Sequence, residues 1–277
     1  MSREPQWALR SNQYVKRPRI GNPTHRPTYP EIPIQCSGTG IIWEKFPYEA
    51  IKPSSMKRSR ARFRASLPEL VWNAAALEGN NFTLPEVKTL LDGVTIGGKR
   101  TKDAEQIIAL SLGYNEVDTL VASGKWSLTK NVSDRIHAHV AQYEAIESGH
   151  FRGEGHVKGG GTVRLADGGV VPGGNHGEGG ALLRQNYEEL LSRLSTFTDS
   201  RERALVYFAA ATRHQFYFDG NKRTARLMMT GELMSHGYDL VAIPFARKLE
   251  FNNALDVLFS TDDATTLLTF LSTCTMK

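Results

Sequence analysis

Cysteine is scarce in this sequence. Only Cys36 and Cys274 occur among 277 residues, and neither has a second cysteine or a histidine at the short spacing of a zinc site. We therefore expect neither a disulfide framework nor a structural zinc ion. So few thiols fit a reducing compartment, which favours a cytoplasmic location.

Long hydrophobic runs are also missing. No stretch approaches the roughly 20 apolar residues that span a membrane, and the start, Met1-Ser2-Arg3-Glu4-Pro5, lacks the apolar core of a signal peptide. Hydrophobic residues still make up 40% of the chain, and the mean hydropathy is -0.36. We expect a soluble protein with a real core and no membrane partner.

Neither sign of charge dominates, since 34 Lys and Arg against 29 Asp and Glu leave a net charge of +5. Such a mild excess suits nucleic acid, acidic partners or nucleotide phosphates and does not choose among them. The densest basic stretch lies at residues 57–64, where Phe63 is the only aromatic that bases could stack on. We interpret it as a solvated linker or helix start, and do not expect nucleic acid as a partner.

Proline is concentrated near the N-terminus, with seven of the 12 prolines in the first 50 residues, where little periodicity is visible. This composition predicts an extended arm. We divide the chain into a Pro-rich and basic arm at 1–65, an N-terminal helical region at 66–125 and a main domain at 126–277.

Helical signals begin at Ser66. The segments 66–69 and 83–86 both read as capping boxes, and the first helix stops at Gly79-Asn80, a pair suited to a left-handed cap. Apolar residues then recur at helical spacing, which predicts a mainly α fold. The further helices that we expect cover residues 101–123, 131–148, 181–196 and 202–213.

Residues 149–180 differ, because 13 of these 32 residues are glycine and a long helix cannot persist there. Two short apolar segments flank a tight Asp-Gly-Gly turn, which predicts a β-hairpin. The hairpin is either a floppy surface loop or a flap whose backbone edge offers hydrogen bonds to an extended peptide. Its residues are Thr162, Val163, Arg164, Val170 and Val171.

The most informative stretch runs from Arg213 to Arg226 and joins two helices through an Asp-Gly turn. The N-terminus of a helix after such a turn attracts phosphate, because its N–H groups are unpaired and the helix dipole favours anions. Asp219 is placed to hold Mg²⁺, while Arg223 and Arg226 would reach outer phosphates. The plainer alternative is a capped helical hairpin with surface arginines.

This stretch resembles the signature of the Fic/Doc family, His-Pro-Phe-x-Asp/Glu-Gly-Asn-Gly/Lys-Arg-x-x-Arg, over the turn, the arginine pair and the apolar helix that follows. Upstream, Leu77-Glu78-Gly79-Asn80 is similar to the family's inhibitory motif, and the glycine-flanked hairpin matches the family's flap. The resemblance spans about residues 66–275.

The resemblance implies a Fic-type helical bundle with a β-hairpin flap, which transfers AMP from ATP to a hydroxyl of a target protein bound through the flap. It implies that Asp219 holds Mg²⁺ and that Glu78 inhibits the site by pairing with Arg226. The residues it places on the nucleotide phosphates are Gly220, Asn221, Lys222, Arg223 and Arg226.

The sequence departs from the signature at the general base. An ungapped match puts Gln215 where the family has its catalytic histidine, and glutamine cannot accept a proton at physiological pH. His214 stands one residue earlier, rotated by about 100° on a helix, unless a bulge brings it back. Ala74 also stands where the inhibitory motif has Ser or Thr. Lys222 stands where the signature more often has glycine; in this the sequence resembles the Doc branch of the family, which includes a protein kinase.

Three functions therefore stay open at this stage. The chain is a protein adenylyltransferase that works without the usual base, or with His214 in its place. Alternatively, it is a catalytically impaired, ATP-binding pseudoenzyme or interaction module, or a Doc-like phosphotransferase. The sequence does not name the target protein or the oligomeric state.

Overall fold

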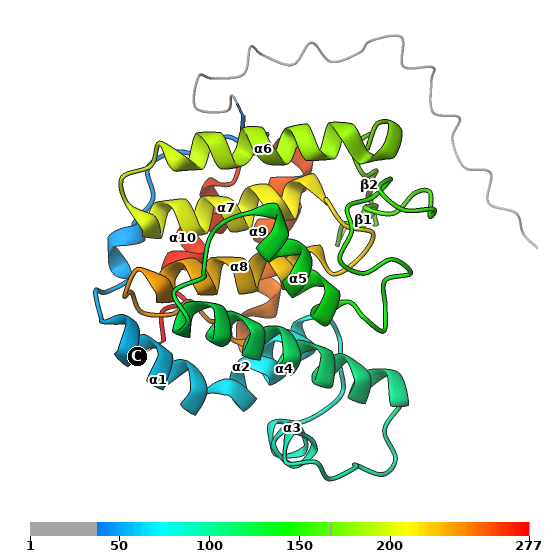
Figure 1. Ribbon diagram of the computed structural model, residues 1–277, viewed down its shortest axis with the longest axis vertical. Coiled ribbons are helices and arrows are strands. Elements are labelled where there is room, and N and C mark those ends of the chain that lie inside the picture. Colours follow the sequence, from blue (N-terminus) through cyan, green and yellow to red (C-terminus); the bar gives the residue numbers. More distant parts are fainter. Residues whose placement is uncertain (1–37, 167, 277) are drawn as a thin grey trace, which may run out of the picture. The chain divides into compact units, whose positions relative to one another are not determined.

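The computed structural model describes residues 38–166 and 168–276. Within them the chain forms ten α-helices and one two-stranded sheet (Figure 1). The helices are α1 (Met56–Ala65), α2 (Leu67–Leu77), α3 (Leu84–Leu91), α4 (Thr101–Ala122), α5 (Lys130–Val140), α6 (Ala181–Ser195), α7 (Ser200–His214), α8 (Asn221–Ser235), α9 (Lys248–Thr261) and α10 (Thr265–Ser272). The predicted mainly α fold is confirmed.

Helix α8 lies at the centre of the bundle and packs against α7, α4, α5 and α1. Thirteen of its 15 residues are buried, so it has no solvent-facing stripe, as expected of a core helix. In Figure 1, α6, α7 and α8 follow one another from the top of the view to its middle. This burial fixes the N-terminus of α8, where the predicted phosphate site begins.

The expected helices at 101–123, 181–196 and 202–213 are confirmed within a residue or two as α4, α6 and α7. The helix expected at 131–148 is too long, because α5 ends at Val140. Tyr143 and Ile146 are 51% and 70% exposed, so their apolar spacing does not mark a buried stripe. None of the helices among the described residues is long and apolar enough to cross a membrane.

The capping signals had different outcomes. At Thr83 the backbone N–H donates to the Glu86 carboxylate at 2.7 Å, as a capping box requires. At Ser66 no side-chain cap forms. Ser66 follows directly on α1, and its N–H already donates to Arg62 O, so it ends one helix as it begins the next.

The described part of the N-terminal arm does not lie loosely on the surface. Ile41, Phe46, Ile51 and Phe63 are buried in the same core as the later helices. The basic residues of α1 are largely paired: Arg60 and Arg64 with Asp118, and Arg62 with Asp239. The expectations for residues 1–37, including Cys36, lie outside the described residues.

The hairpin forms as expected. Strands β1 (Val163–Arg164) and β2 (Val170–Val171) pair antiparallel, with Val163 opposite Val171 and Arg164 opposite Val170. Helix α9, which the sequence did not predict, holds the hairpin's tip, because the Ala166 N–H donates to the Asp256 carboxylate at 3.1 Å. The hairpin is therefore fastened over α9 at one side of the α8 N-terminus.

Candidate functional site

The turn between α7 and α8 is closed by one asparagine. Asn221 accepts from the Tyr217 N–H at 2.8 Å and donates to the Tyr217 carbonyl, also at 2.8 Å, and to Gln215 Oε1 at 3.0 Å. Gln215 caps α7 in the left-handed region, with φ of 53°, a conformation that costs a non-glycine residue roughly 1 kcal/mol. The side chain of Asn221 is thus fully used in shaping the turn.

His137 supports the same turn from α5. Its Nε2–H donates to the Asp219 carbonyl at 2.8 Å, and its Nδ1 accepts from the Gly149 N–H at 2.8 Å. Burial lowers the pKa of His137 to about 4, so the ring is neutral at neutral pH, as this pair of bonds requires. Gly220 has a φ of 76°, and a Cβ there would lie 3.2 Å from Ala141 Cβ.

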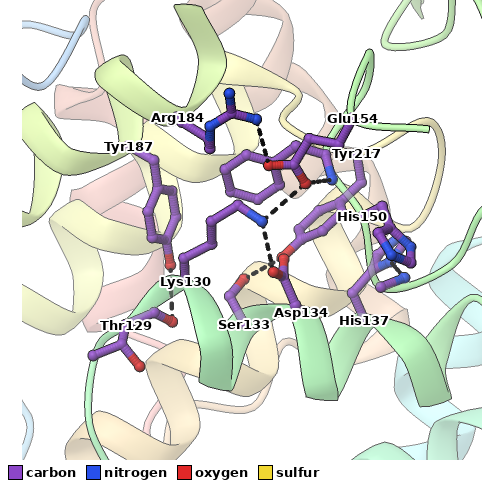
Figure 2. A network of polar contacts seen from close by, with 12 residues as sticks. Thr129, Lys130, Ser133, Asp134, His137, His150, Glu154, Arg184, Tyr187 and Tyr217 are labelled. Atoms are coloured by element: carbon purple, nitrogen blue, oxygen red, sulfur yellow. Dashed lines mark hydrogen bonds and ion pairs between the residues drawn. The ribbon is translucent and has the colours of Figure 1, made fainter. Parts of the chain in front are cut away.

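Tyr217, which stands where the signature has phenylalanine, is anchored by a polar network (Figure 2). Its ring stacks on His137 at 3.7 Å, and its hydroxyl donates to Asp134 at 2.8 Å. Lys130 bridges Asp134 at 2.6 Å and Glu154 at 2.9 Å. Nothing in the sequence pattern predicted this network, because its members come from α5, the glycine-rich segment and the signature.

A pocket of about 540 Å³ opens at the N-terminus of α8. This volume is in the usual range for small-molecule sites. Four elements line it: the end of α2, the hairpin, the turn before α8, and α9. The lining residues are Leu77, Glu78, Thr162, Val163, Arg164, Leu165, Ala166, Gln215, Phe218, Asp219, Gly220, Asn221, Lys222, Arg223, Lys248, Asn252, Leu255, Asp256 and Phe259.

The structure thus brings most of the predicted site residues together. The N–H groups of Asn221, Lys222 and Arg223 have no acceptor among the described residues, because they open α8. Of the hairpin residues, Thr162, Val163 and Arg164 line the pocket, whereas Val170 and Val171 do not.

Arg223 is already neutralised. It is only 4% exposed and forms ion pairs with Glu144 and, at 3.4 Å, with Asp219. Glu144 Oε1 also accepts from Gln106 at 2.8 Å, and Gln106 accepts from Asn80 at 2.9 Å. Glu144 and Gln106 were not predicted, and no sequence signal marks them, since they lie in a non-helical turn and in mid-helix.

Glu78 pairs with Lys222 and not, as predicted, with Arg226. Its Oε2 lies 3.0 Å from Lys222 Nζ, and its Oε1 is buried without a hydrogen-bond partner among the described residues. Burial by itself would raise the pKa of Glu78, but the positive charges of Lys222, Arg223 and Arg226 outweigh it and lower that pKa. Glu78 is therefore ionised. It forms its ion pair with Lys222 because the flexible Lys222 side chain reaches the end of α2.

Arg226 is the unusual residue of the site. It is 3% exposed, and none of its three guanidinium nitrogens has a hydrogen-bond partner among the described residues. It does not line the pocket, but lies one helical turn beyond Lys222, over the Phe251 ring at 6.0 Å. Burial lowers its pKa, because an unpaired charge is costly away from water.

The two candidate base residues point in different directions. Gln215 lines the pocket, but its amide donates to the Thr212 carbonyl at 2.6 Å and accepts from Asn221. His214 lies on the other side of the turn, where its Nε2–H donates to the Thr39 carbonyl at 2.9 Å and its ring stacks on Phe216. Burial also lowers the pKa of His214. No bulge brings His214 into the pocket.

Comparison with solved structures supports the helical fold. A solved Fic domain containing signaling protein from Bacteroides thetaiotaomicron matches with a TM-score of 0.64 at 22% identity, covering 82% of this chain and 88% of that one. Fic-1 from C. elegans matches with a TM-score of 0.62 at 18% identity, covering 79% of this chain and 67% of that one. The chain has the fold of the Fic-domain proteins.

Sequence relatives support the Fic family too. The chain is 26% identical over 231 residues to proteins named protein adenylyltransferase Fic from Drosophila erecta and Drosophila melanogaster, which covers 82% of the chain and 44% of each relative. It thus spans less than half the length of these relatives. No family model matches the chain.

We expect replacement by methionine to have opposite effects on stability at the two buried arginines, Arg226 and Arg223. Arg226→Met removes an unpaired buried charge, so we expect it to raise stability by about 1 kcal/mol, or about 2–4 °C in the thermal midpoint. Arg223→Met leaves Glu144 unpaired in a buried position, so we expect a loss of about 3–5 kcal/mol. Thermal unfolding of both variants tests this. Destabilisation by Arg226→Met would mean that Arg226 has a partner in solution.

Proposed function

We propose that this chain binds ATP with Mg²⁺ at the N-terminus of α8 and transfers AMP to a hydroxyl of a target protein. One observation carries the proposal: the three unpaired N–H groups of Asn221, Lys222 and Arg223 lie at a pocket, with the unpaired Arg226 side chain one turn behind. Such a combination is suited to a polyphosphate. The relatives named protein adenylyltransferase Fic supply the reaction class.

The residues present fit the substrate and its metal. The unpaired nitrogens of Arg226 are groups that a terminal phosphate would satisfy. The Asp219 side chain is 57% exposed at the pocket, and Mg²⁺ commonly takes one or two carboxylates together with substrate phosphates and water. Mg²⁺ would neutralise phosphate charge as the bond to the leaving group breaks. Gly220 lets the backbone turn at the pocket, and the N–H groups of Asn221 to Arg223 would hold the phosphates.

The reaction would proceed without a histidine base. The target hydroxyl oxygen would form a bond to the α-phosphorus as the bond to pyrophosphate breaks, and the hydroxyl proton would pass to water. Gln215 cannot take that proton, and His214 faces away from the pocket. Positioning by the α8 N–H groups and the arginines would supply the remaining acceleration. General-base assistance is worth about 10²–10⁴-fold, so we infer a slow transferase.

A second function keeps its support from the same residues. The Gln215 side chain is hydrogen-bonded to Thr212 and Asn221 and is not available to a reacting group. The site could therefore bind nucleotide without catalysing its transfer. The chain would then be an ATP-binding pseudoenzyme or interaction module, with the hairpin as its docking edge for the target. Because Lys222 is the residue shared with the Doc branch, a Doc-like phosphotransferase is a further candidate activity.

Nucleotide binding is the first test. We expect wild-type protein to bind ATP in the presence of Mg²⁺, and Arg226→Ala to weaken binding by about tenfold or more, because a charge-assisted contact is worth about 1.5–3 kcal/mol. Arg64→Ala, on the exposed face of α1, serves as a control of matched charge. Calorimetry measures all three, and equal affinities would refute the phosphate placement.

The base position gives a second test. Gln215→His should raise transfer of label from α-labelled ATP by about 10²-fold or more, since it restores a proton acceptor in the pocket wall. His214→Ala should lower thermal stability, because a buried ring is lost, yet leave transfer per folded molecule unchanged. Loss of transfer in folded His214→Ala would show that His214 reaches the reacting atoms.

Autoinhibition by Glu78 is the third test. Its carboxylate, which is paired with Lys222, places a negative charge in the pocket wall, where a triphosphate must lie. This negative charge disfavours productive nucleotide binding. Glu78→Gly should therefore increase labelling from ATP about fivefold or more, whereas Glu69→Gly, in the first turn of the same helix, should not. Equal labelling by wild type and Glu78→Gly would remove Glu78 from the mechanism.

A further inference from the structure

Two cations on one face of α8 are available to a single carboxylate. Lys222 and Arg226 stand four residues apart on α8, so their side chains lie on the same face of the helix. Glu78, at the end of α2, pairs with Lys222 at 3.0 Å. Glu78 Oε1 and all three nitrogens of Arg226 have no hydrogen-bond partner among the described residues. One carboxylate thus lies within electrostatic reach of both cations and bonds to one of them.

The two ion pairs would differ in strength. Lys222 is 33% exposed, so its pair with Glu78 is partly screened by solvent. Arg226 is only 3% exposed, and a pair with Glu78 there would be poorly screened and hard to part. In the present arrangement the carboxylate is in the solvent-screened pair, and Arg226 has no hydrogen-bond partner among the described residues.

We propose that Lys222 is a positioning residue that holds Glu78 away from Arg226 and so keeps Arg226 open to an incoming phosphate. This inference rests on the proposed nucleotide site and deepens its regulation. Without Lys222, the buried carboxylate has Arg226 as the remaining unpaired cation, and pairing satisfies both. The site then becomes more strongly inhibited, because phosphate must displace a buried ion pair.

An unfolding experiment tests this without nucleotide. Arg226→Met should raise the thermal midpoint when Lys222 is present and lower it in the Lys222→Gln background, where Arg226 would be the partner of Glu78. We expect all four proteins of this cycle to fold, because Lys222 is partly exposed and Met fills the buried position of Arg226 without a charge. A higher midpoint with Arg226→Met in both backgrounds would overturn the proposal, and a reversed sign would support it.

A binding experiment tests the consequence. Lys222→Gln should weaken Mg²⁺-dependent ATP binding about tenfold in the presence of Glu78, and change it less than about twofold in the Glu78→Gly background. Equal losses in both backgrounds would mean that Lys222 binds phosphate directly, and tighter binding by Lys222→Gln would mean that its ion pair is itself inhibitory; either result overturns the proposal. Absence of ATP binding in all four proteins would refute the proposed function, while the unfolding cycle still decides the role of Lys222.

Discussion

The hydrogen bonds of Asn221 are the constraint on which the site depends. Asn221 ties the backbone of Tyr217 and the side chain of Gln215 to the first turn of α8. This fixes where α7 ends and where the unpaired N–H groups of α8 point. Because α8 is buried on almost every side, the turn cannot shift without disturbing the core. The pocket is thus built on a rigid element, which is what positioning of a polyphosphate requires.

Charge distribution around that rigid turn is uneven. Arg223 is neutralised by Glu144 and Asp219, Lys222 is paired with Glu78, and Arg226 has no partner among the described residues. An unpaired buried cation lowers stability, and proteins retain such groups mainly at functional sites. The two arginines therefore differ: Arg223 joins α8 to the segment between α5 and the hairpin, and Arg226 is the group that a phosphate would contact under the proposed function.

Gln215 and Tyr217 hold the turn before α8 firmly. Gln215 forms the left-handed cap of α7 and bonds to Asn221, and the Tyr217 hydroxyl bonds to Asp134 at 2.8 Å. The network around Lys130 then joins this corner to α5 and α6 (Figure 2). These side chains fix the shape of the turn, and Gln215 supplies no proton acceptor there. Shape and chemistry are thus separable in this fold, which is why binding and transfer need separate tests.

Local patterns in the sequence were enough to determine the helical class, the hairpin and the Asp-Gly turn that precedes α8. Periodicity, glycine content and the Asp-Gly turn each act over a few residues, so they can be read without the tertiary structure. The position of His214, outside the pocket, also followed from its one-residue offset on a helix. The apolar spacing at Tyr143 and Ile146 wrongly predicted that the helix continues to residue 148. These side chains are exposed, so no packing against the core extends α5 beyond Val140.

Only the tertiary structure decided which charges meet. Glu78 pairs with Lys222 instead of Arg226, Glu144 takes Arg223, and Asp256 holds the hairpin's tip. Each contact joins residues far apart in the chain, so its partners depend on helix packing and side-chain reach, which no local pattern encodes. The sequence by itself therefore determined where the turn before α8 and its exposed N–H groups would form. The packing of α2, α5 and α9 against α8 determined which of its cations is left unpaired.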